Sequence, residues 1–504
     1  MRIAVRTRLG LLLGLAAVLV WVAPAAAAAA KLPPGAAPYG LVASNANFVT
    51  GKTLAERTAS YRRLYRAGVR AIRVDINWVE VEPVGKPLHD YAFRERDREV
   101  RAITDAGLRI IGILAYGHPD YSTRGKFLGS TPVGGGIPPF YVANAQYFPP
   151  DNPEDFARYA RTVAHRYRRQ AIGWEVWNEE NEGWRFWPPR EDPATYGRLL
   201  CAAYRAVKRS GSAAPVLFGG VFFPAIADEP GTSGPGFVEQ AYGANPRIGR
   251  CYDAMAYHPY PYPFTAPELD VPVRGSVLAA RDAMHAVLAR HGDGSKQLWI
   301  TEVGWPTHRG YGVSEEKQAQ YVARMQAATF AQRLPVLTWY TYGDYDDPSD
   351  ANQEAHFGFF RADGTPKPSY FALGAFARVF AGTHFVADRS RALGLPPGAE
   401  NTGGRGFALE YARAGARITA LWYANESGAE GQGAGPSGGT AGPATVRVRL
   451  PVRAHRVTIV GFLGSRRTVG VPKSGRLSLV LGPGPLYVID PGRTASRTRG
   501  RHRG

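Results

Sequence analysis

The chain has 504 residues, a formal net charge of +19 at pH 7 and an aromatic content of 12%. Such a length exceeds one small domain and suits a catalytic core with an accessory domain. No run of basic residues is interleaved with aromatic ones, so the positive charge does not indicate a nucleic-acid groove. Three arginines in the first thirty residues and five in the last thirteen leave +11 on the body. An anionic partner such as an acidic polysaccharide is compatible with this charge, and so are arginine-rich solvated faces without a partner.

The first thirty residues have the parts of a secretory signal peptide. Arg2, Arg6 and Arg8 precede the apolar stretch LGLLLGLAAVLVWVA and a run of alanines with small-residue cleavage sites. We therefore expect residues 1–30 to be removed and the protein to be secreted, or associated with the cell envelope. An uncleaved anchor is the alternative, although a bilayer span needs about 20 apolar residues. No later segment is apolar enough to predict stable membrane insertion.

The helices that follow have recognisable ends. Thr53 and Glu56 fit a capping box, and Gly68 stands where a helix would stop. The junction Ala-Gly-Val-Arg at 67–70 recurs as Ala-Gly-Leu-Arg at 106–109, each time between a predicted helix and a predicted strand. This repetition indicates βα units in series.

Eight short strands rich in Val, Ile and aromatic residues are predicted within residues 38–382. They lie at 39–44, 71–78, 108–116, 172–179, 215–221, 254–260, 297–305 and 336–343. Eight βα units with continuously apolar strands favour an α/β fold of the (β/α)8 TIM-barrel type. A doubly wound open sheet is the competing arrangement.

From residue 383 the pattern changes to short alternating strands with glycine and proline between them. These strands are expected at 406–412, 416–425, 444–451, 455–462, 476–482 and 485–490. We predict a small antiparallel β-sandwich at 383–491, interrupted by a flexible Gly/Ala/Ser-rich loop. Residues 492–504 are predicted to be a disordered basic tail.

A cluster of glutamates lies in the fourth predicted strand, within the run GWEVWNEENEG at 173–183. In a parallel barrel the chemistry lies at the carboxyl ends of the strands. Glu175 and Glu179 share one face by the period of two, and Glu179 lies at the carboxyl end. Glu175 is expected to be a barrel-interior or structural residue, Glu180 to point the other way and to be solvated, and Glu182 to be a loop charge.

A second glutamate is predicted at the same end of the barrel. The seventh predicted strand ends in ITEVGWP, which contains Glu302, and strands four and seven of such a barrel lie roughly opposite each other. Two converging carboxylates, one a proton donor and one a nucleophile, are what glycoside hydrolysis with retention of configuration requires.

These motifs resemble a known group of enzymes. The pattern W-E-V-W-N-E-E-N at 174–181, followed by I-T-E-V-G-W near Glu302, resembles the clan A retaining glycoside hydrolases, especially family 39-like and family 5-like members. The resemblance covers residues 38–380 and implies that Glu179 is the acid/base and Glu302 the nucleophile. Many relatives have proline where this chain has Glu180, so an additional carboxylate stands beside the acid/base. If it lies close to Glu179, it would raise the proton affinity of that residue or favour a cationic group on the substrate.

The resemblance also implies further substrate-binding residues. Arg73 resembles the arginine that steadies the nucleophile, with a salt bridge inside the barrel as the alternative, and Asn178 resembles the asparagine that binds the sugar 2-hydroxyl. His258 and Tyr260 resemble a pair near the nucleophile, and Trp339 resembles a tryptophan beneath the sugar at the cleavage point. Four other tryptophans near strand ends are weaker candidates, since indole rings are more often core residues: Trp78, Trp184, Trp187 and Trp305.

Two cysteines, Cys201 and Cys251, complete the set of chemically notable residues. Export favours a disulfide between them, and two buried thiols are the alternative. Neither a zinc motif, a phosphate loop nor a serine-hydrolase elbow is present, so we expect no metal and no organic cofactor.

The sequence thus predicts a secreted, monomeric, retaining glycosidase that acts on a polysaccharide or oligosaccharide, and the net positive charge is compatible with an anionic substrate. A transglycosidase would use the same residues, because a sugar hydroxyl can replace water. A non-catalytic glycan-binding envelope protein is the alternative from another class, and the presence of both glutamates, Asn178 and Arg73 argues against it.

Overall fold

The computed structural model describes residues 41–46, 49, 51–123, 145–183, 185–223, 232–261, 264–269, 276–310, 312–346, 352–399, 403–425 and 444–492. The predicted signal peptide, Trp184, the Gly/Ala/Ser-rich loop and the basic tail beyond Gly492 lie outside these residues. Within the described part of the chain, no helix is long and apolar enough to cross a membrane.

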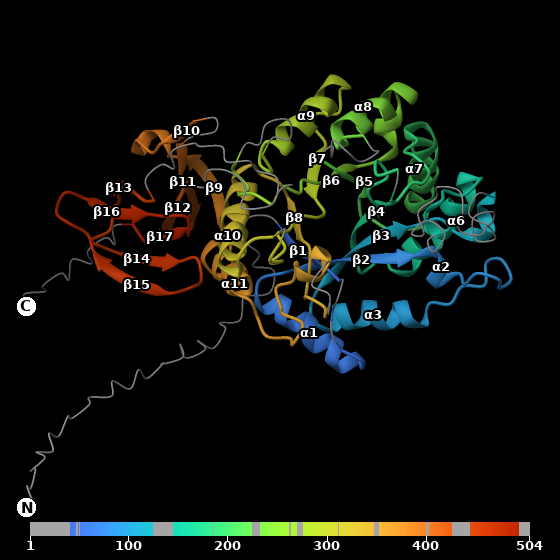
Figure 1. Cartoon of the computed structure of the whole chain (residues 1–504), viewed down its shortest axis with the longest axis horizontal. Helices are drawn as coiled ribbons and strands as arrows, with labels where there is room; N and C mark the ends of the chain where they lie inside the picture. The colour runs from blue at the N-terminus through green and yellow to red at the C-terminus, as the bar shows by residue number, and fades with distance from the viewer. Residues whose placement is uncertain are drawn as a thin grey trace, which may run out of the picture. The chain divides into compact units, whose positions relative to one another are not determined.

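Eight parallel strands form a closed barrel in chain order (Figure 1). They are β1 (Leu41–Asn45), β2 (Ala71–Asn77), β3 (Arg109–Ala115), β4 (Ala171–Val176), β5 (Val216–Phe222), β6 (Ala254–His258), β7 (Gln297–Ile300) and β8 (Val336–Trp339). β1 pairs with both β2 and β8, which closes the ring. The predicted barrel is therefore confirmed, and the open-sheet alternative is wrong.

Helices alternate with these strands along the chain (Figure 1). They are α1 (Leu54–Arg66), α2 (Trp78–Val81), α3 (Arg94–Asp105), α6 (Pro153–Arg166), α7 (Pro193–Lys208), α8 (Gly234–Ala244), α9 (Ala280–Arg290), α10 (Glu315–Ala331) and α11 (Pro368–Phe380). Short 3₁₀ turns lie at Pro119–Tyr121, Ala145–Tyr147, Ile248–Cys251, Gln353–His356 and Arg391–Leu393.

The two repeated junctions behave as predicted. The Thr53 side chain accepts from the backbone N–H of Glu56, whose carboxylate in turn accepts from the Thr53 N–H, so the capping box at the start of α1 is confirmed. Gly68 follows α1 with φ +98° and Gly107 follows α3 with φ +88°. Both values lie in the region that favours glycine, so each glycine ends a helix and returns the chain to a strand.

The barrel interior changes from apolar to charged toward the carboxyl ends of the strands. Its apolar cluster consists of Ala71, Ile111, Leu217, Ala254, Ala256, Trp299 and Val336. Arg73 follows Ala71 by two residues on β2, at the next inward position, and is 1% exposed. Glu175 on β4 is bonded to Arg73 and is 0% exposed. A layer of buried charged side chains thus lies between the apolar cluster and the mouth of the barrel.

The C-terminal region forms two antiparallel layers. A seven-stranded sheet contains β9 (His384–Asp388), β10 (Pro397–Ala399), β11 (Gly403–Arg413), β12 (Ala416–Ala424), β14 (Arg456–Gly461), β15 (Arg466–Gly470) and β17 (Leu486–Asp490). The second sheet pairs β13 (Val446–Pro451) with β16 (Arg476–Leu481). Apolar side chains from both sheets share one cluster, which includes Leu421 and Leu479. The predicted antiparallel region is confirmed, whereas β9, β10 and β15 were not foreseen as strands.

The barrel and these sheets touch through buried polar groups. Trp422 on β12 donates from its indole N–H to Glu268, at 2.7 Å. Arg324 on α10 donates to the carbonyl oxygen of Pro483, also at 2.7 Å, and is fully buried. One hydrophobic cluster continues from the barrel helices into β11, β12 and β17. The catalytic candidate residues are thus carried on a barrel that packs directly against the sheets.

Candidate active site

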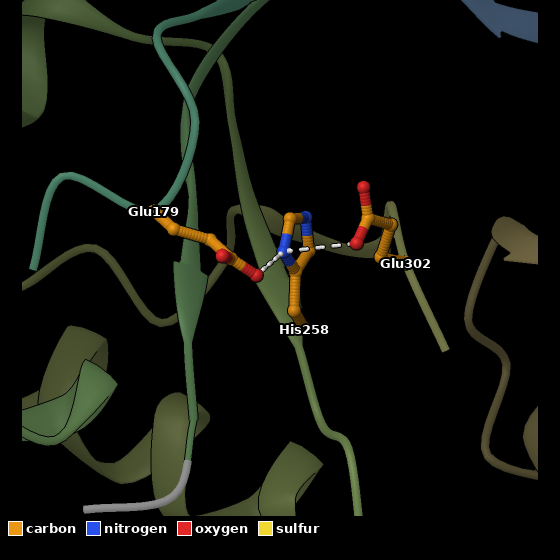
Figure 2. Close-up of side chains that lie close together, drawn as sticks. All are labelled: Glu179, His258 and Glu302. Carbon is orange, nitrogen blue, oxygen red and sulfur yellow. Dashed lines mark hydrogen bonds and ion pairs between the residues drawn. The ribbon is translucent and has the colours of Figure 1, made fainter. Parts of the chain in front are cut away.

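Three side chains meet at the carboxyl ends of the barrel strands. Glu179 follows the end of β4, His258 is the last residue of β6, and Glu302 follows the end of β7. Figure 2 shows the imidazole of His258 between the two carboxylates. Carboxylate oxygens of Glu179 and Glu302 and a ring nitrogen of His258 all lie within 4.8 Å of one another. The two predicted glutamates therefore converge as expected for residues at strand ends of a barrel.

The Glu302 carboxylate accepts hydrogen bonds from three elements. Arg73 Nη1 lies 2.5 Å and Asn45 Nδ2 3.0 Å from its Oε1 atom. The Tyr260 hydroxyl donates to its Oε2 atom at 2.9 Å. These donors come from the chain at β1, β2 and the segment after β6, so they hold the carboxylate in one orientation.

Arg73 is the centre of a buried charge network. Its guanidinium donates twice to Glu175, from Nε at 3.0 Å and from Nη2 at 2.7 Å, in addition to its bond to Glu302. Nη2 also donates to Asn178 Oδ1, at 2.8 Å. A buried arginine is stable only when carboxylates and hydrogen bonds compensate for lost hydration, and here two carboxylates do so. The sequence allowed two interpretations of Arg73, a residue that orients Glu302 and a salt bridge inside the barrel. The structure agrees with both, because Arg73 bonds to Glu302 and to Glu175.

Burial separates the acid-base properties of Glu179 and His258. Removal from water raises the pKa of Glu179 to about 7, against the lowering effect of the Arg185 and Arg73 charges. Burial lowers the pKa of His258 to about 4, although the nearby Glu302 opposes the change. His258 is therefore neutral at pH 7. Its Nδ1 lies 2.8 Å from Glu179 Oε1, and its Nε2 lies 3.0 Å from the Thr301 hydroxyl.

Local backbone geometry, and not continued pleating, places Glu179. β4 ends at Val176, and the backbone φ angles of Trp177 and Glu179 are +73° and +49°. The Glu179 N–H donates to the carbonyl oxygen of Gly220 at 3.1 Å, which ties this turn to β5. Left-handed conformations are uncommon for residues other than glycine and are often found at functional sites. The predicted period-two alternation therefore stops before it reaches Glu179.

The prediction that Glu180 is solvated is wrong. Its side chain is fully buried, and neither carboxylate oxygen has a hydrogen-bond partner of normal geometry among the described residues. It lies against Gly219, where an added Cβ would come within 2.1 Å of Glu180 Oε2. Burial raises the pKa of Glu180 well above its usual value, which favours the protonated form. The broken strand turns this residue inward instead of toward solvent.

The other two glutamates of the run are buried as well. Glu175 is 0% exposed and bonded to Arg73, in agreement with the prediction of an interior residue. Glu182, expected to be a loop charge, is only 7% exposed. Its carbonyl oxygen accepts from the N–H groups of Arg185 and Phe186, so the segment after Glu179 folds back into a compact turn.

The four candidate tryptophans that the structure describes are packed in the interior. Trp339, the last residue of β8, is 1% exposed and has ring contacts with Trp305 and Phe359. Trp78, Trp187 and Trp305 are equally buried, with exposures of 1%, 2% and 1%. The core interpretation of these three is therefore correct.

Several residues near the carboxylates were missed. Asn45 ends β1 and Thr301 precedes Glu302, so the strand-end rule would have found both. Asp75 follows Arg73 by two residues and shares its inward face, and burial raises the pKa of Asp75 to about 6. The positive charge of Arg185 interacts with the carboxylates of both Glu179 and Glu302. Arg185 lies in a turn, where the periodicities of helices and strands give no prediction.

The triad of Glu179, His258 and Glu302 also has the ligand types that bind a divalent cation. The nearby Arg73 guanidinium, 2.5 Å from Glu302, would repel such an ion. The arrangement thus suits a pair of reacting carboxylates better than a metal centre.

Cys201 on α7 and Cys251 in the 3₁₀ turn before β6 form a disulfide. Their Cα atoms are 4.7 Å apart. The bond fastens the outer part of the barrel and takes no part in the carboxylate cluster.

No family model matches the chain. Among solved structures, a family 39 glycoside hydrolase from Bacteroides cellulosilyticus WH2 has a TM-score of 0.64 at 21% identity, over 90% of this chain and 81% of that one. A GH39 enzyme from Xanthomonas axonopodis pv. citri has a TM-score of 0.57 at 15% identity, over 90% and 94%. A monomeric beta-xylosidase from Caulobacter crescentus CB15 has a TM-score of 0.56 at 14% identity, over 90% and 97%. At these identities the likeness establishes a shared fold.

Proposed function

We propose that this chain is a secreted glycoside hydrolase that cleaves O-glycosidic bonds of a polysaccharide or oligosaccharide with retention of configuration. The observation on which the proposal depends is the separation of the two carboxylates. One carboxylate oxygen of Glu179 and one of Glu302 lie within 4.8 Å of each other, an approach of single atoms that is compatible with the short separation of a retaining pair. Retaining glycosidases have carboxyl groups about 5–5.5 Å apart, whereas inverting ones need roughly 6.5–9.5 Å to admit a water molecule.

In the first step Glu302 attacks the anomeric carbon, and the bond from this carbon to the leaving oxygen breaks. Glu179 donates its proton to that oxygen, so the aglycone departs as an alcohol and a covalent glycosyl-enzyme remains. A pKa of about 7 keeps Glu179 substantially protonated at neutral pH, as this step requires. The hydrogen bonds from Arg73, Asn45 and Tyr260 direct Glu302 for the attack.

In the second step water attacks the same carbon. Glu179, now ionised, removes a proton from the water, the bond to Glu302 breaks, and the sugar leaves with its original configuration. The neutral His258 lies 2.8 Å from Glu179 and can position this carboxyl group in both protonation states.

Asn178 is placed to bind substrate. Its Oδ1 atom accepts from Arg73, which fixes the amide and leaves its N–H donors without a partner among the described residues. These donors would serve the sugar 2-hydroxyl, where hydrogen bonds strengthen in the transition state. The solved structures with this fold include enzymes named beta-xylosidase and glucosidase, so xylosides and glucosides belong in the first substrate panel.

The proposal is tested with a panel of 2-deoxy-2-fluoro glycosides, which trap the glycosyl-enzyme, followed by peptide mass spectrometry. We expect a label on Glu302 in the wild type and no label in Glu302→Gln. Glu154→Gln, which changes an exposed glutamate on α6, serves as the matched control and should label normally. A label on another residue would overturn the assignment of the nucleophile.

The stereochemistry is tested separately by proton NMR of the first product formed from an active substrate. Retention requires the product to appear with the anomeric configuration of the substrate before mutarotation. Initial formation of the opposite anomer would contradict the double displacement even if the chain hydrolyses glycosides.

A further inference from the structure

The C-terminal sheets contain a cavity of about 370 Å³ that the proposed reaction does not use. Glu410 on β11, Thr419 on β12 and Val488 on β17 lie directly opposite one another in the strand register. These three side chains form the floor of the cavity, and Pro451 and Arg476 of the second sheet contribute to its wall. The cavity thus lies where the two sheets separate.

Both carboxylates at the cavity are already satisfied. Glu410 accepts from Arg389 at 3.4 Å and lies 3.2 Å from Arg417. Asp490 accepts from the backbone N–H groups of Arg453, Ala454 and Gly492, at 2.8, 3.1 and 3.0 Å. Neither acid therefore needs another cation.

Two arginines at the cavity have no ion-pair partner among the described residues. The side chains of Arg453 and Arg476 are solvent-exposed and have no carboxylate or hydrogen-bond partner among the described residues. With Arg389 and Arg417 they make four positive charges against two negative ones. The cavity therefore has a surplus of two positive charges, held on side chains that can reach a ligand.

The lining also offers groups suited to a sugar. Thr419 is 7% exposed, lines the cavity, and its hydroxyl bonds to no other described residue. Leu393 and Leu450 supply apolar surface on which a pyranose ring can rest. The volume lies within the range of roughly 300–1,000 Å³ common for small-ligand sites.

We propose that this cavity binds an acidic sugar residue, a uronate, of a polysaccharide. Arg453 and Arg476 receive the carboxylate, because guanidinium groups bind carboxylates through paired hydrogen bonds, and Thr419 receives a hydroxyl. That the anion belongs to a sugar depends on the proposed glycosidase function, whereas the anion site itself depends only on the cavity. A polymer held here would be attached to the same chain as the barrel, which raises its local concentration for repeated cleavage.

The test is isothermal titration calorimetry of tetragalacturonate against the full chain carrying Glu302→Gln, which prevents turnover. In this background R453Q/R476Q should weaken binding by about tenfold or more, since each variant side chain loses a charge-assisted hydrogen bond. The matched control is R447Q/R449Q, which removes the same charge from exposed positions of β13 outside the cavity. It should change binding by less than about twofold.

Each other outcome overturns the proposal. Equal weakening by both double variants would mean general electrostatic attraction, and no weakening by either would place the ligand elsewhere. Binding of inorganic sulfate or phosphate as tightly as tetragalacturonate would mean a simple anion site, and equal binding of cellotetraose would mean that the carboxylate is not recognised. Because the experiment measures binding without turnover, an enzyme that hydrolyses nothing but retains this pattern would contradict only the proposed catalysis.

Discussion

The barrel mouth and the cavity of the C-terminal sheets both collect arginines and carboxylates, but they use them in opposite ways. Arg73 is 1% exposed and is bonded to Glu175 and Glu302. Arg453 and Arg476 are exposed and bonded to no acid that the structure describes. Burial makes pairing obligatory, because an unpaired charge out of water is very costly, whereas water stabilises an exposed charge and leaves it free to meet a ligand.

The same contrast occurs between neighbours in the sequence. Glu179 and Glu180 are both buried, but Glu179 contacts His258 and faces the cluster around Glu302, whereas Glu180 lies against Gly219 without such partners. Their carboxyl groups therefore differ in what they can do. In the proposed mechanism Glu179 exchanges a proton with the substrate, whereas Glu180 is a buried carboxyl group with a raised pKa in the wall behind it.

The largest expected effect is the loss of the nucleophile. Glu302→Gln keeps the side-chain volume but cannot form the glycosyl-enzyme, so kcat should fall on the order of 10⁴-fold. Initial rates on the best substrate of the panel measure this, and circular dichroism checks the fold. A decrease in kcat of less than tenfold would show that Glu302 is not the nucleophile.

The buried network should be the part most sensitive to a broken pair. Arg73→Met leaves Glu175 and Glu302 without their shared cation, and we expect a loss of about 3–5 kcal/mol in the free energy of unfolding. Urea denaturation measures it, with Arg62→Met on the surface of α1 as control. A loss below about 1 kcal/mol would mean that the charges of the mouth do not depend on this arginine.

The pH dependence of catalysis should follow Glu179. The first step needs its protonated form, and its pKa of about 7 in the folded protein means that kcat/KM stays high below pH 7 and falls above it. The fall should approach tenfold per pH unit, as for one ionising group. A profile measured with Glu179→Gln should lack this limb, and a wild-type limb unchanged to pH 9 would contradict the assignment.

Glu180 should affect stability more than chemistry. Its pKa is raised in the folded chain, so its contribution is fully present below the unfolded pKa and is lost as pH rises toward the folded value. Glu180→Gln cannot ionise, so the variant should gain stability relative to wild type as the pH rises above the unfolded pKa of a glutamate, about 4.3, by up to about 1.4 kcal/mol per pH unit. Thermal denaturation at several pH values measures the slope, with the exposed Glu95→Gln as control. Parallel slopes for wild type and Glu180→Gln would show that Glu180 is ionised.

The smallest effect should come from the exposed arginines. R453Q/R476Q breaks no described ion pair, so the free energy of unfolding should change by no more than about 0.5 kcal/mol. The same urea titration as for Arg73→Met allows direct comparison. A loss near that of Arg73→Met would mean that these arginines are structural and would remove the contrast between the two regions.

The sequence by itself determined the elements that local rules control. Strand periodicity, the Thr53–Glu56 capping box and the glycine stops at Gly68 and Gly107 predicted the barrel, because each depends on residues within a few positions of one another. The rule that active sites of such barrels lie at the carboxyl ends of the strands predicted that Glu179 and Glu302 lie at the same end of the barrel. β9, β10 and β15 were missed because each has only three to five residues, too few to show a clear alternation. β10 and β15 pair with adjacent strands of the chain, whereas β9 pairs with the more distant β11.

Only the tertiary structure decided what each charge near the mouth does. The left-handed turns at Trp177 and Glu179 ended the strand alternation and buried Glu180, contrary to the sequence prediction. The shared use of Arg73 by Glu175 and Glu302, and the pKa of Glu179, follow from desolvation by elements scattered along the chain. Pattern in a sequence reports which face a residue prefers, but the electrostatic state of a group depends on every neighbour that excludes water from it.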